Sequence, residues 1–344
     1  MNKRKLLLLL GGSKNTTASI GVTTTGAQTV TISALTVDTG KTLNVDWGDG
    51  TNNDYTGAGA RTHNYAGSGT WAIRFDHAEY ITVFNCSDDK VTLNSKDIKR
   101  MVNVTDFRIN SLKAGTFNSS DISAWRPSTF YLYSMPAGYT GTFDCADVSA
   151  WRPSTFLLYS MPAGYAGTFD SADVSAWRPS NFYLRSMPAG YAGTFNSSDI
   201  SAWRPSDFYL YSMPAGYAGT FDSSDVSAWR PLNFFLYSMP IATFTVTIAA
   251  SGFAAWITTA TFQMRDNSLS QAQVNQILAD FWAGFATRTA VGGTINIGGS
   301  NAAPSGIYQP ANPPTTGLEY RYELLNDSQN INPTKKWATV TVTA

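Results

Sequence analysis

The side chains that most often carry catalysis are few in this chain of 344 residues, and they are not paired. His63 and His77 are its two histidines, and neither belongs to a sequence pattern that couples a base to a nucleophile. The aspartates within 46–54 lack the Asp-x-Asp-x-Asp-Gly spacing of a calcium-binding loop. We therefore expect no catalytic residue, no metal site and no cofactor. We expect solvated carboxylates in a turn, and His63 packed beside Tyr65.

Thiol chemistry is also sparse. Cys86 and Cys145 are the two cysteines, and they lie in different sequence contexts, Cys145 at a position where other copies of a repeat have serine. They do not form a disulfide framework, so they do not indicate whether the protein works in an oxidising or a reducing compartment. We expect both thiols to be free and structural.

The residues that recur at fixed spacing are mostly aromatic. Copies of one sequence are spaced 26 residues apart and begin with Gly-Thr-Phe at Gly115, Gly141, Gly167, Gly193 and Gly219. Each copy continues through Asp-Ile/Val-Ser-Ala-Trp-Arg-Pro, an aromatic run and Ser-Met-Pro. A fixed period in this range is typical of a solenoid, in which a unit too small to bury its own core stacks on its neighbours. We therefore expect five stacked repeats over 115–240.

Within one repeat, apolar side chains stand at Phe156, Leu158, Met161, Tyr165 and Phe169. This spacing resembles the leucine-rich repeat, L-x-L-x-x-N-x-L-x-G-x-I, with Met161 in the asparagine place and two extra residues before Tyr165. The resemblance implies a parallel sheet in which the marked residues point inward and those between them point outward. Because the asparagine that normally bonds the bend is replaced, we expect Pro and Gly to shape the corner.

The expected strands place equivalent residues of the repeats in columns. The inward columns are Phe130, Phe156, Phe182, Phe208 and Phe234, and Leu132, Leu158, Leu184, Leu210 and Leu236. One outward column is Tyr131, Leu157, Tyr183, Tyr209 and Phe235, and a second is Tyr133, Tyr159, Arg185, Tyr211 and Tyr237. A flanking column is Thr129, Thr155, Asn181, Asp207 and Asn233. Because adjacent strands lie about 4.8 Å apart, the outward columns form two aromatic ladders about 20 Å long.

Two interpretations of these ladders stay open. In a binding face, the rings would stack on sugars or on partner side chains while their hydroxyls hydrogen-bond. In a purely structural role, neighbouring rings would stack on each other and stabilise the sheet. Stacking alone would leave a large sticky patch in water, so we favour binding or assembly. The candidate site residues are Tyr131, Tyr133, Tyr159, Tyr183, Arg185, Asp207, Tyr209, Tyr211, Phe235 and Tyr237.

The tryptophan of each repeat is expected to pack the back of the solenoid. It follows Ser and Asp residues that favour a short 3₁₀ turn, which Arg-Pro would end. The tryptophans are Trp125, Trp151, Trp177, Trp203 and Trp229. We expect the arginine that follows each of them to stack on the tryptophan of the preceding turn.

Residues 16–80 are rich in Thr, Val and Gly with alternating apolar positions, which predicts strands with one buried face. The turn Trp47-Gly-Asp-Gly, followed by His63, Tyr65 and Gly69, resembles the PKD family of immunoglobulin-like β-sandwich modules. This resemblance implies an extracellular or virion module that serves as a spacer or in adhesion, not an enzyme.

Atypical repeats are expected at both ends of the stack, because terminal repeats must cover its exposed ends. We expect degenerate turns over 81–114 and a carboxyl-terminal cap over 241–344, with a helix over 271–282. Residues 262–269 match the leucine-rich pattern in full, and this ending resembles the caps of leucine-rich-repeat proteins encoded by phages and gut bacteria. Strand propensity is high over 320–324.

The bulk charge and the amino terminus limit the possible partners. The formal net charge is zero and charged residues make up 14% of the chain, which argues against a nucleic-acid partner. The apolar run Leu6–Leu10 is shorter than the roughly 7–15 residues of a signal-peptide core. It is also shorter than the about 20 residues of a transmembrane helix. We expect an amino-terminal tail over 1–15, with a degenerate export signal as the alternative.

These features together predict a mainly β, non-enzymatic structural or adhesion protein. Its parts would be a PKD-like or immunoglobulin-like sandwich, a leucine-rich-repeat-like solenoid and an α/β cap. We expect a phage virion component, a tail or head fibre that contacts other virion or surface proteins, further copies of itself, or glycans. An exported adhesin, secreted or held on the bacterial cell surface, is the alternative. A glycan-active enzyme built on a solenoid comes third.

Overall fold

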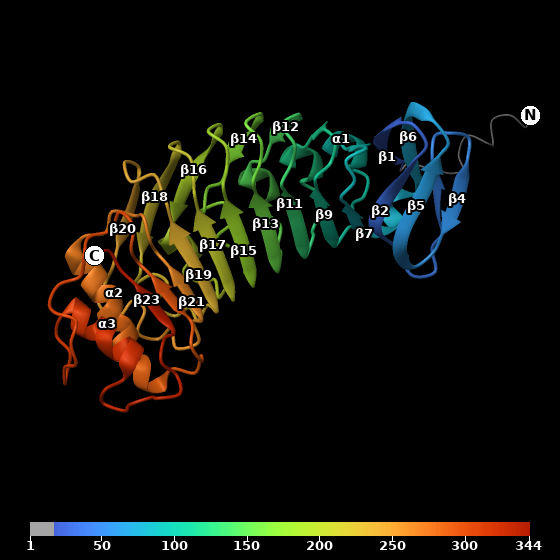
Figure 1. Cartoon of the computed structure of the whole chain (residues 1–344). Coiled ribbons are helices and arrows are strands. Elements are labelled where there is room, and N and C mark those ends of the chain that lie inside the picture. The colour runs from blue at the N-terminus through green and yellow to red at the C-terminus, as the bar shows by residue number, and fades with distance from the viewer. Residues whose placement is uncertain (1–16) are drawn as a thin grey trace, which may run out of the picture.

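The computed structural model describes residues 17–344 and shows a mainly β protein with few helices (Figure 1). Its body is a β-solenoid of about seven turns, with an antiparallel sheet at the amino-terminal end. Helices α2 (Gln271–Ala283) and α3 (Gly317–Asn326) lie at the other end. The predicted tail over 1–15, with its apolar run, lies outside the described residues.

Antiparallel strands form the amino-terminal module. They are β1 (Ala18–Thr25), β2 (Gln28–Val37), β3 (Leu43–Asp46), β4 (Asn52–Tyr55), β5 (Ala58–Tyr65) and β6 (Ser68–Asp76). One sheet has the order β4-β3-β6-β1-β8, in which β8 (Val91–Thr92) comes from the chain that follows the module. The alternating apolar residues that predicted these strands, such as Val22, Val45 and Ile73, are fully buried. The 3₁₀ turn η1 (Ala78–Tyr80) leads from the module into the solenoid.

Within the described residues 17–344, one sheet of twelve strands extends from the amino-terminal module to the carboxyl-terminal part, in the order β23-β22-β21-β19-β17-β15-β13-β11-β9-β7-β2-β5. The antiparallel pair β2 and β5 therefore extends the parallel strands of the solenoid. The parallel strands are β7 (Ile81–Cys86), β9 (Asp106–Asn110), β11 (Thr129–Tyr133), β13 (Thr155–Tyr159), β15 (Asn181–Arg185), β17 (Asp207–Tyr211), β19 (Asn233–Tyr237), β21 (Thr261–Gln263), β22 (Thr294–Asn296) and β23 (Thr339–Thr341). Equivalent residues of neighbouring repeats, such as Phe130, Phe156 and Phe182, are direct partners.

A second parallel sheet closes each turn. Its strands are β10 (Gly115–Thr116), β12 (Tyr139–Thr142), β14 (Tyr165–Thr168), β16 (Tyr191–Asn196), β18 (Tyr217–Asp222) and β20 (Phe244–Thr247). Short 3₁₀ turns follow at η2 (Ser119–Ile122), η3 (Cys145–Val148) and η4 (Ser197–Ile200), and the short helix α1 (Ser95–Ile98) takes this place in an earlier turn. The three 3₁₀ turns lead to the buried Trp125, Trp151 and Trp203, as the sequence predicts, whereas the buried Met101 takes this place after α1.

The inward columns of the main sheet form the core. The Phe, Leu and Trp columns predicted from the repeat are all fully buried. Successive phenylalanines stack on one another, for example Phe130 on Phe156 with ring centroids 5.8 Å apart. Trp151 packs against Phe130 at 5.1 Å, so each tryptophan joins the core of its neighbouring turn.

Proline and glycine shape the corner of the repeats, as expected: the N–H group of Tyr165 donates to Pro162 O at 2.9 Å across a Pro-Ala-Gly-Tyr turn. The serine before this turn adds a feature that was not expected. Left-handed backbone with φ of 50–53° occurs at Ser134, Ser160, Ser186, Ser212 and Ser238. The N–H group of Ser160 donates to Arg185 O of the next turn at 3.3 Å, which ties the corner to its neighbour. A glycine with positive φ is needed in the second sheet. At Gly167, with φ of +136°, a Cβ atom would lie 2.2 Å from Phe143 O of the preceding turn.

The bends near the carboxyl end use asparagine, as the match over 262–269 predicts. Asn267 Nδ2 donates to Leu236 O at 2.8 Å. Asn301 Nδ2 donates to Met264 O and to Ile297 O, each at 2.9 Å. The two side chains therefore satisfy main-chain carbonyls of the last turns, which otherwise would be buried without a partner.

In the carboxyl-terminal part, one predicted element is confirmed and another is wrong. The helix predicted over 271–282 is α2, and Ser270 caps it in a capping box with Gln273. The strand expected over 320–324 is wrong, because these residues lie in α3. Thr316 and Glu319 form a second capping box that fixes the start of α3. A 3₁₀ turn, η5 (Phe285–Thr287), follows α2.

Candidate binding face

The main sheet carries two outward columns of residues, in the register that the repeat predicts. The first column is Tyr131, Leu157, Tyr183, Tyr209 and Phe235. The second column is Tyr133, Tyr159, Arg185, Tyr211 and Tyr237. All of these residues are half-exposed, whereas the residues that alternate with them are buried. The structure therefore brings every candidate site residue except Asp207 into two adjacent columns, which we call the aromatic face.

Rings of one column stack face to face. The centroids of Tyr183 and Tyr209 are 4.2 Å apart, and those of Tyr209 and Phe235 are 4.3 Å apart. Tyr211 and Tyr237 stack at 4.2 Å with an interplanar angle of 13°. Neighbours therefore cover most of the ring faces and leave ring edges and hydroxyls at the surface. A sugar stacked on an aromatic ring needs an open ring face, so this geometry suits a partner that contacts edges and hydroxyls.

Arg185 takes the place of a ring in the second column. Its guanidinium carbon lies 3.9 Å from the ring centroid of Tyr159 and 5.4 Å from that of Tyr211. A planar cation between two tyrosines continues the stack through cation–π contacts. The one charged residue of the column therefore lies within the stack instead of interrupting it.

Two further arginines, which the sequence analysis missed, close the ends of these columns. Arg108 in β9 lies over Tyr131 at 4.5 Å and holds Asp106 in a bidentate ion pair with distances of 2.7 and 2.8 Å. Arg265, just after β21, lies over Tyr237 at 4.2 Å. Arg108 could have been found from the sequence by aligning residues 81–114 with the repeats. That alignment places Arg108 in the first outward column, and in the structure Arg108 pairs in register with Tyr131.

The hydroxyl groups of Tyr183 and Tyr211 are neutral hydrogen-bonding groups at neutral pH. Burial raises the pKa of Tyr183, and the nearby Asp207 and Tyr209 raise it further. Burial also raises the pKa of Tyr211 to about 12, although Arg185 acts in the opposite direction. The face therefore presents phenols that can donate as well as accept.

Asp207 belongs to a hydrogen-bonded row beside the aromatic face. Asn233 Nδ2 donates to Asp207 Oδ1 at 2.7 Å. The amide of Asn181, in the orientation that satisfies its neighbours, donates to Asp207 Oδ2 at 2.9 Å. Asp207 and Arg185 occupy opposite ends of neighbouring strands, four positions apart in register, so their backbones are roughly 13 Å apart. The carboxylate and the guanidinium do not converge on one point.

His63 packs beside Tyr65 in the amino-terminal module, as predicted, and is partly exposed. Its ring stacks on Trp47 at 4.8 Å and meets the edge of Tyr65 at 4.6 Å. His63 Nε2 lies 2.7 Å from Asp49 Oδ2. Burial raises the pKa of Asp49, but hydrogen bonds from Thr51 and His63 outweigh this effect and lower it to about 2. The ionised carboxylate therefore stabilises the turn between β3 and β4.

Cys86 and Cys145 are free, as predicted, and both are buried. Cys145 stands in a row of serines that bond one turn to the next. In the following turn, Ser171 Oγ donates to Asp199 Oδ2 at 2.5 Å, and the Cys145 thiol makes the equivalent contact to Asp173 at 3.4 Å. Burial raises the pKa of both thiols, that of Cys86 to about 12. Cys145 therefore serves as a structural substitute for serine.

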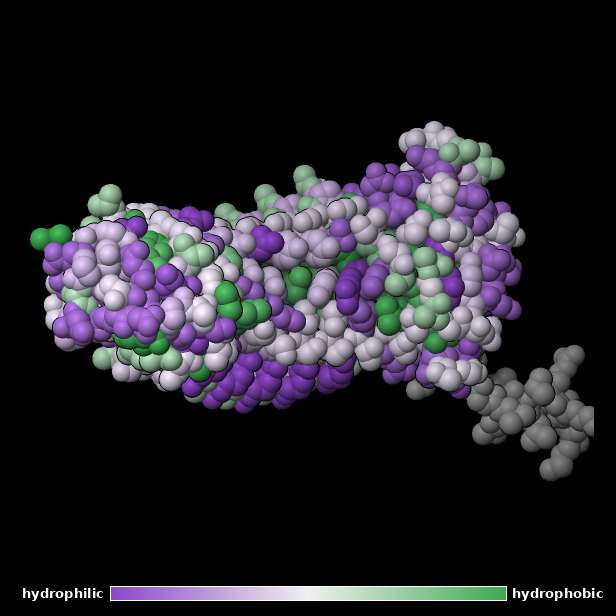
Figure 2. All heavy atoms as spheres, turned by 60° about the horizontal axis from the view of Figure 1, so that its bottom comes forward, coloured by the Kyte–Doolittle hydropathy of each residue, from purple (hydrophilic) through white to green (hydrophobic). Residues whose placement is uncertain are grey.

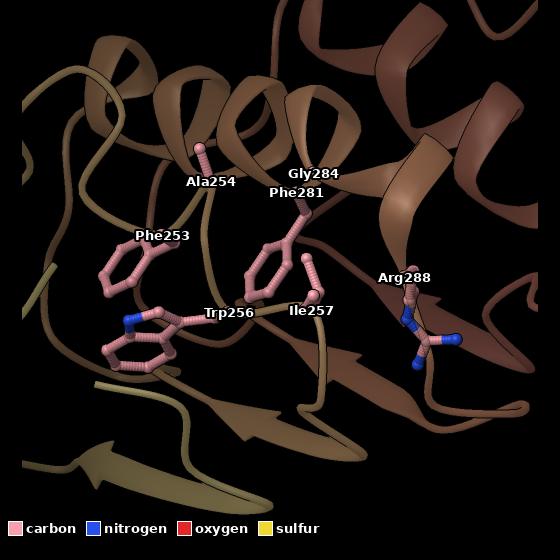
Figure 3. Close-up of a pocket in the computed structure, with 7 residues that line it drawn as sticks. All are labelled: Phe253, Ala254, Trp256, Ile257, Phe281, Gly284 and Arg288. Atoms are coloured by element: carbon pink, nitrogen blue, oxygen red, sulfur yellow. The ribbon is translucent and has the colours of Figure 1, made fainter. Parts of the chain in front are cut away.

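The cavities of the carboxyl-terminal part lie apart from the aromatic face. One of about 10 Å³, room for a single water, is lined by Phe253, Ala254, Trp256, Ile257, Phe281, Gly284 and Arg288 (Figure 3). Arg288 lies 3.8 Å over the ring of Trp337 and donates to the main-chain carbonyls of Thr259 and Gly292, so it is a packing residue. A cleft of about 400 Å³ beside α3 is lined in part by Tyr308 and Arg321.

No protein family, curated protein or solved structure matches this chain. Between residues 17 and 344, no helix is long and apolar enough to cross a membrane. The same residues hold no group of three or more His, Cys, Asp or Glu side chains placed to bind a metal ion.

Proposed function

We propose that the protein is a non-enzymatic structural or adhesion protein whose aromatic face binds a partner or mediates assembly. The observation that carries this proposal is the pair of stacked, half-exposed aromatic columns on one sheet. Tyrosine-rich surfaces offer apolar contact area and hydroxyl groups at a low cost in side-chain entropy. Contiguous exposed surfaces of this kind are typical of interaction sites.

The stacked geometry favours a partner that extends over several turns. Each ring offers only an edge and a hydroxyl group, so a single sugar or side chain gains little from one turn. A protein surface or an extended glycan chain meets equivalent groups on every turn, about 4.8 Å apart. We infer that Arg185 and Asp207, where the repeats differ, set the specificity of the face.

We propose a phage virion as the setting, with the protein as part of a tail or head fibre. Three features support it: the elongated shape between two end modules (Figure 1), the antiparallel amino-terminal module and the low overall charge. The proposal takes the amino-terminal module as PKD-like and the solenoid as leucine-rich-repeat-like, with Asn267 and Asn301 at the bends as support. An exported bacterial adhesin of the same build is the alternative.

A glycan-active enzyme on the solenoid is the third proposal. Glycoside hydrolysis uses two carboxyl groups that flank one bond, usually within about 10 Å of each other. Beside the aromatic face, Asp207 is hydrogen-bonded on both oxygens, and the charged Arg185 of the face lies at the other end of the strands. This arrangement favours binding over catalysis.

The decisive experiment removes hydroxyl groups without disturbing the stack. The double variant Tyr183→Phe/Tyr209→Phe and the control Tyr80→Phe/Tyr322→Phe are compared with the wild type. Both pairs of tyrosines are half-exposed, but the control pair lies outside the aromatic face. Binding is measured on a glycan array and self-association by sedimentation velocity.

We expect glycan binding or self-association to weaken at least tenfold in the double variant and to remain in the control. If the double variant binds as tightly as the wild type, the aromatic face takes no part in the interaction. Hydrolysis of any array glycan by the purified protein would refute the non-enzymatic proposal.

A further inference from the structure

A column of arginines runs along the solenoid apart from the aromatic face. Each repeat carries one arginine directly after its buried tryptophan: Arg126, Arg152, Arg178, Arg204 and Arg230. All of them are exposed. Because adjacent turns are about 4.8 Å apart, their guanidinium groups follow a line about 20 Å long. Figure 2 shows a row of strongly hydrophilic residues along the lower edge of the elongated body.

Each guanidinium is fixed by one terminal nitrogen. Nη1 of Arg152 donates to Ser149 O at 3.0 Å and to Trp151 O at 2.5 Å, and Nη1 of Arg178 donates to Ser175 O at 2.7 Å. The other three arginines make the same pair of bonds. The expected stacking on tryptophan is wrong, because the arginine–ring contacts within residues 17–344 do not involve this column.

The other edge of each guanidinium, formed by Nε and Nη2, makes no hydrogen bond or ion pair within the described residues 17–344. Arg108 shows what this edge can hold, since its Nε and Nη2 bind the two oxygens of Asp106 at 2.7 and 2.8 Å. The aspartate in the turn of Arg152 is engaged elsewhere, because Asp147 accepts from Ser119 at 2.5 Å. Each column arginine therefore offers a pre-oriented fork for a bidentate oxyanion.

The alignment of these forks suits a chain of anions better than a single one. Like charges on neighbouring turns repel one another, and a polyanion laid along them removes this repulsion while it releases counterions. The hydrogen bonds of Nη1 hold each side chain in place, so binding costs little side-chain entropy. A linear polymer with one acidic group per unit matches a linear array of forks.

We propose that the arginine column binds a linear acidic polysaccharide that carries carboxylates on successive sugar units. A single-stranded nucleic acid would need aromatic rings for its bases, and the neighbouring tryptophans are fully buried. An anionic membrane is a plane, whereas this column is one residue wide. The inference does not depend on the function proposed for the aromatic face.

The test measures binding of the full chain to immobilised polygalacturonate, with neutral dextran as the reference polymer. We expect the wild type to bind polygalacturonate and not dextran, and to bind more weakly at 200 mM than at 50 mM salt. The triple variant Arg152→Gln/Arg178→Gln/Arg204→Gln should bind at least tenfold more weakly. The control Lys41→Gln/Arg74→Gln/Lys113→Gln loses the same charge from exposed positions elsewhere and should bind like the wild type.

A triple Arg→Lys variant at positions 152, 178 and 204 separates charge from geometry. Lysine keeps the charge but lacks the fork, so we expect affinity between the wild type and the glutamine variant. Circular dichroism checks folding, because the arginines also bond the main chain. If the triple glutamine variant does not fold, Arg178→Gln alone should weaken binding about threefold.

Failure of the wild type to bind polygalacturonate, or equal losses in the column variant and its control, would overturn the proposal. Tighter binding to phosphatidylserine vesicles or to single-stranded DNA in the same assay would also overturn it and assign the column to that class. The variant Tyr183→Phe/Tyr209→Phe should keep its affinity for polygalacturonate. A failure of this inference is thereby distinguished from a failure of the aromatic-face proposal.

Discussion

Replacing Leu157 with tyrosine completes the first aromatic column and is expected to stabilise the solenoid. Leu157 lies in register between Tyr131 and Tyr183, and it is half-exposed, so a ring can stand on the sheet at this position. The new ring would stack on both neighbours in the way that Tyr209 now lies between Tyr183 and Phe235, at 4.2 and 4.3 Å.

The magnitude follows from the two stacked pairs that the new ring creates. Each aromatic pair contributes about 0.5–1.5 kcal/mol beyond the area that it buries, so two pairs contribute about 1–3 kcal/mol. Fixing the tyrosine side chain in one rotamer costs about 1 kcal/mol. The difference is about 0–2 kcal/mol, so we expect the free energy of unfolding of Leu157→Tyr to rise by about 1 kcal/mol, the middle of this range.

Urea denaturation, followed by the fluorescence of the buried tryptophans, measures this difference. The matched control is Tyr209→Leu, which puts a leucine between Tyr183 and Phe235 and so removes the two stacked pairs that Tyr209 forms with them. We expect a higher midpoint for Leu157→Tyr, a lower one for Tyr209→Leu, and an unchanged slope for both. If Leu157→Tyr leaves the midpoint unchanged or lowers it, stacking does not stabilise the sheet and the reasoning is refuted.

Smaller changes test single contacts of the fold. Gly193→Ala places a Cβ atom 2.3 Å from Phe169 O and should lower the free energy of unfolding by more than about 2 kcal/mol. In the control Gly190→Ala, the new Cβ atom has no neighbour closer than 3.4 Å, so the loss in the same urea titration should be less than about 1 kcal/mol. Cys145→Ser should keep the bond between turns and Cys145→Ala should lose about 1 kcal/mol, measured in the same way. The pKa of Asp49 is lowered from 3.8 to about 2, so its contribution to stability is present above the unfolded value and is lost as pH falls from 3.8 towards 2. Thermal melts of Asp49→Asn between pH 2 and 6 should lack this loss, and an equal acid loss in variant and wild type would contradict it.

The repeat made most of the solenoid predictable, because a fixed period places each residue type in one environment. The burial of Phe156, Leu158 and Trp177 and the half-exposure of Tyr183 follow from alternation along a strand and from stacking of equal turns. The serine at each corner was not predictable in the same way, although the Pro-Ala-Gly turn that follows it was. Sequence rules assign positive φ to glycine or asparagine, yet Ser160 adopts it, because its N–H group bonds the next turn.

Local propensity explains the wrong prediction for 320–324. Two tyrosines in five residues favour a strand, but Thr316 and Glu319 carry the helix-start pattern of a capping box, and that signal decided the outcome. The capping pattern is present in the sequence. The capping residues Thr316 and Glu319, which stand just before the aromatic pair, therefore predict α3 better than the strand propensity of the two tyrosines does.

Two positions of the aromatic face at which one repeat differs from the others help to decide whether the rings serve to stabilise the fold or to bind a partner. Arg185 continues the stack although it is not aromatic, so the second column does not need a ring at this position. Leu157 is neither planar nor aromatic, and the solenoid keeps its register through it. The core therefore holds the turns together without an unbroken aromatic column. Rings that the fold does not require at every turn are more readily explained by contact with a partner, which is the proposal that the variants of Tyr183 and Tyr209 test.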